Sequence, residues 1–209
     1  KGGQLVTAFG RQNTKHPHAW DFADQAIINT LMFGQDGLRN PGVQVSALLP
    51  FPFYLEWICS IQNANGETAA SFLFTKNKKF ADRTIIKRNI QSPKDLLYLA
   101  RIKSGFDLSD TVSLVAGGSH LSGPNGTGEN TNTQIYGADL FVKWRPLTAD
   151  HGWPFVTLQA ETMRRVYEAG ATSTPLLSEE VFKNDGFYVQ SLYGFTRRWV
   201  AGIRYEKAD

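Results

Sequence analysis

The sequence predicts an all-β protein, an antiparallel transmembrane β-barrel with long outer loops and short periplasmic turns. Three observations predict it. Apolar and polar residues alternate with a period of two, as in strands that have one apolar face. Short and long connections alternate along the chain, as in outer-membrane barrels. Aromatic residues make up 12% of the 209 residues, and membrane barrels use aromatics at both lipid interfaces, whereas no apolar run approaches the ~20 residues of a membrane helix.

The clearest predicted strand lies at residues 136–144. Its apolar face begins at Tyr136 and ends at Trp144, with only Ala, Leu and Val between them. The opposite face carries Asp139, Lys143 and, just beyond, Arg145. A packed core would have to neutralise these charges, whereas a water-filled interior would not. Similar alternation is found at residues 5–9, 43–49, 53–62, 98–103, 112–119, 156–165, 187–195 and 199–206.

These segments amount to about nine spanning strands, whereas single-chain bacterial barrels close with an even number. The sequence begins within a strand and ends without a terminal aromatic. We therefore expect residues 1–209 to form a single outer-membrane barrel domain that is incomplete at one or both ends. Long loops are expected at 11–41, 63–94, 120–133 and 169–186. A soluble β-sandwich or lipocalin-like barrel, whose strands also alternate, is the alternative.

Composition limits the partners and the covalent chemistry. The chain has 22 basic and 19 acidic residues and a net charge of +3. No stripe of Lys and Arg accompanies this excess, so we expect no nucleic acid partner. The single cysteine, Cys59, excludes an internal disulfide and a Cys-rich metal site. Outer-membrane lipid and lipopolysaccharide are the expected partners, and a protein partner in a larger envelope complex is an alternative.

The polar side chains of the inward faces are expected to line the pore. They either set the preference for an ion or solute, or pair across strands and solvate the interior. Basic residues outnumber acidic ones among them, which favours anionic solutes. The pore-lining set is Glu56, Arg101, Lys103, Asp139, Lys143, Arg145, Gln159, Glu161, Arg165, Arg204 and Glu206.

One cluster has the chemistry of a metal site: His16, His18, Asp21 and Asp24. Imidazole and carboxylate groups suit zinc or another divalent metal. Alternatively, Asp21 caps a short amphipathic helix that stops at Gly34 and folds into the barrel mouth. The helix is the favoured interpretation, so no cofactor is expected, with a divalent metal at this first long loop as the alternative.

Several stretches resemble a known family. The most specific is His16 to Asp24, which reads His-Pro-His-Ala-Trp-Asp-Phe-Ala-Asp. The other matching stretches are Gly10 to Asn13, Gly37 to Ser46, Pro52 to Glu56, Tyr136 to Leu140 and Arg198 to Glu206. They are similar to outer-membrane proteins of Gram-negative bacteria described as porin-like, or as zinc-regulated, TonB-receptor-like barrels without an evident plug. The resemblance implies an outer-membrane channel or uptake protein.

We therefore expect a bacterial outer-membrane channel or uptake barrel for small solutes or metal ions. A structural or partner-binding barrel within a larger complex is the first alternative, and a soluble β-sandwich binding module is the second. Enzymatic activity is not expected. The adjacent Ser119 and His120 would point to opposite faces of a strand, so they could not act as a nucleophile and its base.

Overall fold

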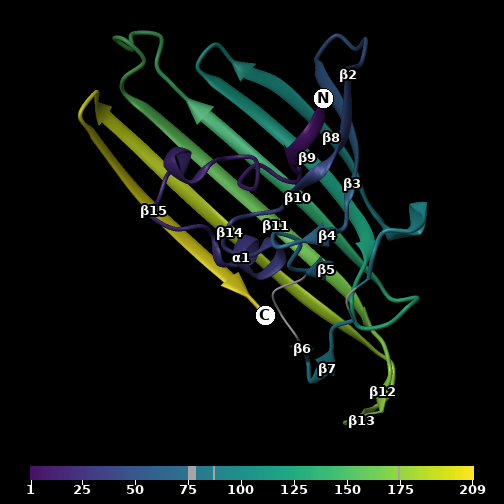
Figure 1. Cartoon of the computed structure of the whole chain (residues 1–209). Coiled ribbons are helices and arrows are strands. Elements are labelled where there is room, and N and C mark those ends of the chain that lie inside the picture. Colours follow the sequence, from purple (N-terminus) through teal and green to yellow (C-terminus); the bar gives the residue numbers. More distant parts are fainter. Residues whose placement is uncertain (75–78, 87, 174) are drawn as a thin grey trace.

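A computed structural model describes the chain except for residues 75–78, 87 and 174. Its main feature is one antiparallel sheet of nine strands in the order β1-β2-β3-β8-β9-β10-β11-β14-β15 (Figure 1). This confirms the predicted all-β class and antiparallel pairing. The sheet is open, with β1 and β15 at its two edges.

The strands of this sheet are β1 (Gly2–Val6), β2 (Arg39–Leu48), β3 (Tyr54–Asn63), β8 (Leu96–Ser109), β9 (Val112–Pro124), β10 (Asn132–Trp144), β11 (Phe155–Ala169), β14 (Glu180–Thr196) and β15 (Trp199–Ala208). The connections hold three two-stranded ladders, formed by β4 (Asn65–Gly66) with β5 (Leu73–Phe74), β6 (Lys79–Phe80) with β7 (Arg83–Thr84), and β12 (Thr172–Ser173) with β13 (Leu176–Leu177). The helical elements are η1 (Pro17–Ala19), α1 (Ile27–Phe33) and η2 (Pro93–Asp95).

The connections fall at two ends of the sheet. The loop end carries residues 7–38, 64–95, 125–131 and 170–179, and the turn end, at the top of Figure 1, carries 49–53, 110–111, 145–154 and 197–198. The expected strict alternation of length is wrong, because 145–154 is longer than 125–131. Strands β9 and β14 extend into the loops expected at 120–133 and 169–186, because polar residues such as Ser122 on β9 and Asn184 on β14 pair within the ladder.

The two faces of the sheet differ in chemistry, as the alternation predicted. We call the outer face the one whose exposed side chains are mostly apolar, among them Val45, Trp57, Ile102, Tyr136, Leu158, Val189, Ile203 and Tyr205. The inner face carries buried side chains, and the polar ones among them include Asn40, Ser60, Gln62, Arg101, Ser119, Thr133, Asp139, Gln159, Glu161, Arg165 and Gln190. The outer face thus exposes apolar groups to the surroundings, whereas the inner face encloses charged groups together with apolar ones.

The inner face is covered by residues 7–38, which we call the inner segment. Helix α1 within it contacts β11, β14 and β15, and in Figure 1 it lies in front of the sheet. The apolar core lies between this cover and the sheet. It includes Phe9, Ile28, Met32, Phe33, Leu38, Phe72, Leu97, Leu99, Leu121, Ile135 and Met163. In the part of the chain that the structure describes, no helix is long and apolar enough to cross a membrane.

Candidate functional site

Helix α1 gives the inner segment its apolar anchor. Ile28 and Met32, four residues apart, lie on one helix face and are fully buried. The helix ends where Gly34 adopts a φ of 80°, a backbone conformation that favours glycine. The predicted stop at Gly34 is therefore confirmed. The predicted cap at Asp21 is wrong, because Ala26 occupies the N-cap position.

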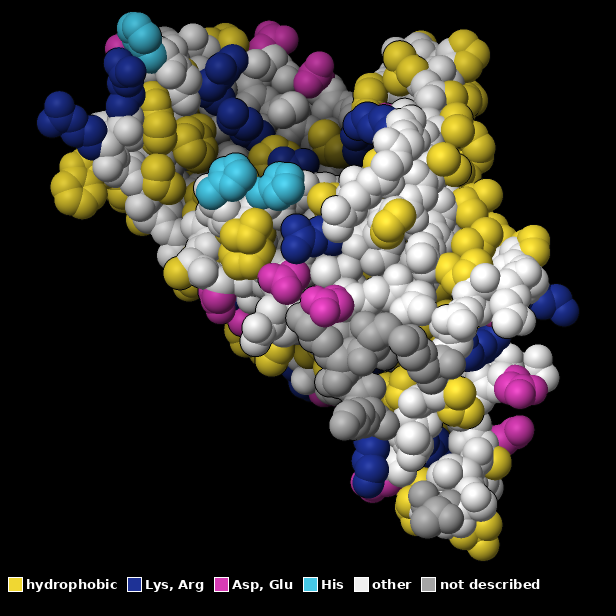
Figure 2. Space-filling model, in the orientation of Figure 1, with side chains coloured by type: hydrophobic (Ala, Val, Ile, Leu, Met, Phe, Trp, Pro, Cys, Tyr) yellow, Lys and Arg dark blue, Asp and Glu magenta, His cyan; other side chains and the backbone are white. Residues whose placement is uncertain are grey.

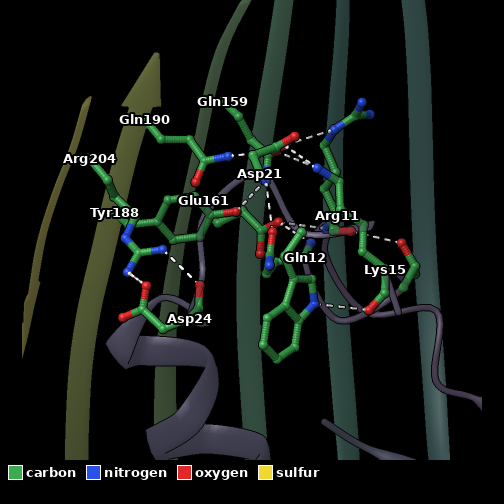
Figure 3. Close-up of polar contacts among 12 residues, drawn as sticks. Arg11, Gln12, Lys15, Asp21, Asp24, Gln159, Glu161, Tyr188, Gln190 and Arg204 are labelled. Carbon is green, nitrogen blue, oxygen red and sulfur yellow. Dashed lines mark hydrogen bonds and ion pairs between the residues drawn. The ribbon is translucent and has the colours of Figure 1, made fainter. Parts of the chain in front are cut away.

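Instead of capping the helix, Asp21 bonds the side chains of Lys15 and Gln190. Its Oδ2 accepts hydrogen bonds from Lys15 Nζ at 2.6 Å and from Gln190 Nε2 at 2.9 Å. Because Gln190 is on β14 of the inner face, this carboxylate ties the loop before α1 to the sheet (Figure 3).

Glu161 on β11 holds the first turn of the inner segment. Its Oε1 accepts the backbone N–H groups of Arg11 at 2.7 Å and Gln12 at 2.5 Å (Figure 3). The preceding Gly10 has a φ of 59°, and a Cβ there would lie 2.7 Å from Glu161 Oε2. Only glycine permits both this conformation and this approach. The turn therefore presents two adjacent donors to one buried carboxylate, as in an anion-binding nest.

An ion pair crosses the inner face beside this turn. Arg101 on β8 and Asp139 on β10 are joined by two hydrogen bonds, of 2.6 and 3.0 Å. The side chains reach across β9 above Gly117, where a Cβ would come within 2.7 Å of both. Ser119 Oγ accepts from Arg101 at 2.7 Å and from the backbone N–H of Gly10 at 3.2 Å. The pair thus also supports the inner segment.

Arg11 extends the contact toward the turn end. Its Nε donates to Gln159 Oε1 at 3.1 Å, and its guanidinium lies 3.7 Å from the centre of the Phe141 ring. Gln159 Nε2 in turn donates to the Tyr188 hydroxyl. Burial lowers the pKa of Arg11, and the nearby carboxylates of Asp139 and Glu161 oppose that effect. The inner segment therefore brings its own cation to a face that already holds acidic groups.

Strand β15 holds the inner segment near α1. Arg204 on β15 pairs with Asp24 at 2.7 Å and with Glu206 at 3.3 Å, and its guanidinium lies 5.0 Å from the Phe22 ring centre. Glu206 Oε2 also accepts the backbone N–H of Ile27 at 2.9 Å. The Glu206 carboxylate on the sheet thus accepts a backbone N–H of the first turn of α1.

Glycines of the inner face make room for apolar side chains of the segment. A Cβ at Gly137 would lie 2.6 Å from the Phe9 ring, and one at Gly186 would lie 2.5 Å from Ile28 Cδ1. Both positions lack the side chain that would displace the inner segment. The sheet is therefore shaped to receive this segment at its apolar contacts as well as at its polar ones.

The predicted pore-lining residues fall into two groups. Five are buried beneath the cover: Arg101, Asp139, Gln159, Glu161 and Arg165. The others keep some exposure, and four of them lie toward the turn end: Glu56, Lys103, Lys143 and Arg145. Figure 2, which views the inner face, shows Lys and Arg side chains gathered around a hollow in its upper part. The predicted pore-lining charges are therefore most accessible in the turn-end half of the inner face, because the inner segment covers the other half.

Arg165 shows how tight the cover is. Its guanidinium donates to Ser71 Oγ at 2.9 Å, to the carbonyl of Leu31 at 3.3 Å and to Asn184 Oδ1 at 2.6 and 3.0 Å. These partners come from two different loop-end connections and from β14, so no face of this cation is left for a passing solute.

Two acidic residues in the turn-end half of the inner face were not among the predicted pore-lining residues. Asp107 and Asp110 line a hollow of about 480 Å³ together with Lys143 and Arg145. Continuing the alternation of Arg101 and Lys103 by four residues would have placed Asp107 on the same face. The turn-end half of the inner face therefore carries acidic and basic groups together, although basic residues outnumber acidic ones in the predicted pore-lining set.

The four candidate metal ligands are not brought together. The rings of His16 and His18 stack 5.7 Å apart, whereas Asp21 bonds Lys15 and Asp24 bonds Arg204. Among the residues that the structure describes, no group of three or more His, Cys, Asp or Glu side chains could hold a metal ion.

Comparison with known proteins gives one informative match. A protein of Aquifex aeolicus (strain VF5), described as an uncharacterized protein, is 31% identical over 218 residues. The match covers 98% of this chain and 43% of the Aquifex protein, so the chain spans less than half the length of that relative. No family model matches the chain, and no solved structure matches it.

Proposed function

We propose that this chain is part of the wall of an outer-membrane β-barrel that passes small solutes or ions, with the inner segment as a constriction. The observation that carries the proposal is the contrast between the two faces of the sheet. Val45 and Ile203 on the outer face are 62% and 73% exposed, whereas Glu161 on the inner face is 2% exposed. An apolar face this extensive is unfavourable in water and favourable in hydrocarbon.

The placement of aromatic side chains supports the same orientation in a bilayer. On the outer face of β10, Tyr136 lies toward the loop end and Trp144 at the turn end, with Ala138, Leu140 and Val142 between them. Exposed Tyr193 and Trp199 also lie toward the turn end. Tyr and Trp favour the two lipid interfaces, so these residues would mark the borders of an apolar band.

The inner segment suits a constriction because its polar contacts can be exchanged for water. Glu161, Gln190 and Arg204 hold it through hydrogen bonds and ion pairs, which water replaces at modest net cost. Beyond it, the turn-end half of the inner face keeps charged groups accessible, in the manner of a vestibule.

A structural, partner-binding barrel is the second candidate, and the completeness of the cover favours it. Arg101, Asp139 and Arg165 are each 7% exposed or less. A barrel whose inside is permanently filled would serve as a scaffold in a larger envelope complex.

Recording from the complete protein in planar bilayers tests these alternatives. A channel gives discrete conductance steps, and Glu161→Ala lengthens or enlarges them, because it frees the N–H groups of Arg11 and Gln12. Ala47→Leu, on the outer face of β2, serves as the control and leaves the conductance unchanged. A protein that inserts but is silent in every variant is a scaffold. A protein that stays folded in solution without detergent overturns the membrane assignment.

A further inference from the structure

The outer face contains a groove that the constriction does not use. Two hollows, of about 710 and about 390 Å³, adjoin on this face and share Ala138 and Thr162. Small residues form the floor: Ala100, Gly118, Ala138 and Ala160. Trp57 and Ile102 stand at one end, and Phe187 and Val189 at the other.

The strand register explains this shape. Ala138 on β10 pairs with Gly118 on one side and with Thr162 on the other. The same row continues to Ile102 and Trp57 in one direction and to Phe187 in the other. Large side chains therefore flank a row of small ones. A Cβ at Gly118 would have no neighbour within 4 Å, so the floor is open to an incoming group.

Polar groups border the groove on its loop-end side. The His120 ring stacks on Tyr136 at 4.7 Å, and His120 Nε2 is buried without a hydrogen-bond partner. Beside them Arg164 forms an ion pair of 2.6 Å with Asp185, and all four side chains line the larger hollow. A ligand with a hydrocarbon chain and a polar head would satisfy both the apolar floor and this border.

We propose that the groove binds one acyl chain of lipopolysaccharide, with the acylated phosphosugar head at His120 and Arg164. This inference rests on the proposed position in the outer membrane. The loop end faces outward in outer-membrane barrels, and lipopolysaccharide forms the outer leaflet there. An ester or amide carbonyl of the lipid accepts a hydrogen bond from His120 Nε2. Arg164 keeps its two bonds to Asp185 and donates its remaining N–H groups to the phosphate.

Native mass spectrometry of the complete protein, released from detergent after incubation with purified lipid A, tests the proposal. The wild type retains one lipid A. Gly118→Leu fills the floor and lowers retention by about tenfold, because the leucine displaces methylenes of the bound chain. Ala47→Leu adds three carbons instead of four, on the outer face of β2, and leaves retention unchanged. His120→Phe keeps the ring stack, removes the hydrogen bond and lowers retention by a few-fold.

Each other outcome overturns the assignment in a recognisable way. Equal retention by Gly118→Leu and the wild type excludes the groove as the lipid site. Equal loss in Gly118→Leu and Ala47→Leu indicates unspecific lipid contact. Retention of phosphatidylethanolamine in preference to lipid A excludes lipopolysaccharide as the source, and a dimer that Gly118→Leu abolishes identifies a second copy as the occupant. If the complete protein stays folded in solution without detergent, the proposed function itself fails.

Discussion

Glu161 is the residue on which the first turn of the inner segment depends. One carboxylate oxygen accepts two consecutive backbone N–H groups, and Gly10 gives it the space to approach. A buried acceptor with two donors cannot be removed without leaving both donors unpaired. The inner segment is therefore anchored to β11 through its own backbone, whatever the identity of the Arg11 and Gln12 side chains.

Glu161→Ala should loosen the inner segment much more than Glu161→Gln, which keeps an oxygen at the same position. Each unpaired N–H group costs about 1–3 kcal/mol, so trypsin should cut after Lys15 on the order of tenfold faster or more in the alanine variant. The measurement is the rate of cleavage at Lys15 in the folded protein. Equal rates for both variants would contradict the role of this oxygen.

Breaking the pair of Arg101 and Asp139 should be severe, and replacing both partners should be mild. Arg101→Met alone leaves a buried carboxylate without its partner, at a cost of about 3–5 kcal/mol. The double variant Arg101→Met, Asp139→Leu removes the stranded charge, so most of that loss should be recovered. Urea unfolding followed by tryptophan fluorescence measures both. A double variant as unstable as the sum of the singles would contradict this account.

Asp95, in the loop-end connection before β8, should make stability depend on acid. The backbone N–H of Gln91, with further help from Ser92 and Arg88, lowers the pKa of Asp95. A carboxyl whose pKa is lower in the folded state stabilises the fold above its unfolded pKa of about 4 and loses that effect as pH falls further. The stability difference between wild type and Asp95→Ala should therefore be large at pH 7.

The same comparison at a pH of about 2.5 should give a smaller difference, because both proteins then lack the charge. Chemical unfolding of the two proteins at the two pH values measures it. A difference that does not shrink in acid would mean that the Asp95 carboxylate stabilises the turn without its charge.

At the scale of the elements, strand β10 illustrates what the sheet requires of glycine on its two faces. Gly137 faces the inner segment, and a methyl group there would lie 2.6 Å from the buried Phe9 ring. Gly118, on the neighbouring β9, faces outward, where a methyl group would meet nothing within 4 Å. The same residue type thus serves packing at one position and leaves open space at the other.

Gly137→Ala should destabilise the protein by about 1–3 kcal/mol, because Phe9 must move. Gly118→Ala should be neutral or slightly stabilising, because it restricts only the unfolded chain. Urea midpoints of the two variants measure the contrast. Equal midpoints would show that Phe9 has room to shift, and would argue against a preformed seat for the inner segment.

The sequence predicted elements well where the information is local. Alternation located the strands of the sheet, although the first one runs from Gly2 to Val6 instead of over the predicted residues 5–9. Gly34 marked the helix end. Strand ends were missed where polar residues such as Ser122 and Gln134 continue the ladder, because pairing partners rather than side-chain polarity hold them in it. The start of α1 was placed too early for a similar reason, since Asp21 bonds Gln190 from β14 instead of capping the helix.

At the scale of the whole molecule, the sequence predicted which residues share a face, whereas the extent of the cover over the inner face was not predicted. Successive residues of a strand point to opposite faces, so alternate positions share a face. The cover depends on contacts between distant residues, such as Arg11 with Glu161, 150 residues apart, and Asp24 with Arg204, 180 residues apart. No local pattern encodes such pairs, although several charged and glycine residues at the contact sites were visible in the sequence.

The native cysteine offers a test of the proposed position in a bilayer. Cys59 lies on the outer face of β3, on the same side as Trp57. A nitroxide attached there in lipid vesicles should be reached readily by oxygen and poorly by a charged nickel chelate, because hydrocarbon excludes the chelate. Glu129→Cys in a Cys59→Ser background, labelled in the exposed connection 125–131, should give the opposite preference. Equal access of the chelate at both sites would contradict membrane embedding.

Strand order in the sheet follows chain order, which has a consequence for biogenesis. Each new strand of the nascent chain can zip onto the hairpin before it with little loop-closure penalty. The inner segment lies between β1 and β2 in the chain, yet several of its bonding partners lie on β11, β14 and β15, which follow more than 100 residues later. The sheet can therefore form before its inner face is fully covered, and the inner segment lacks these partners until β15 has paired with β14.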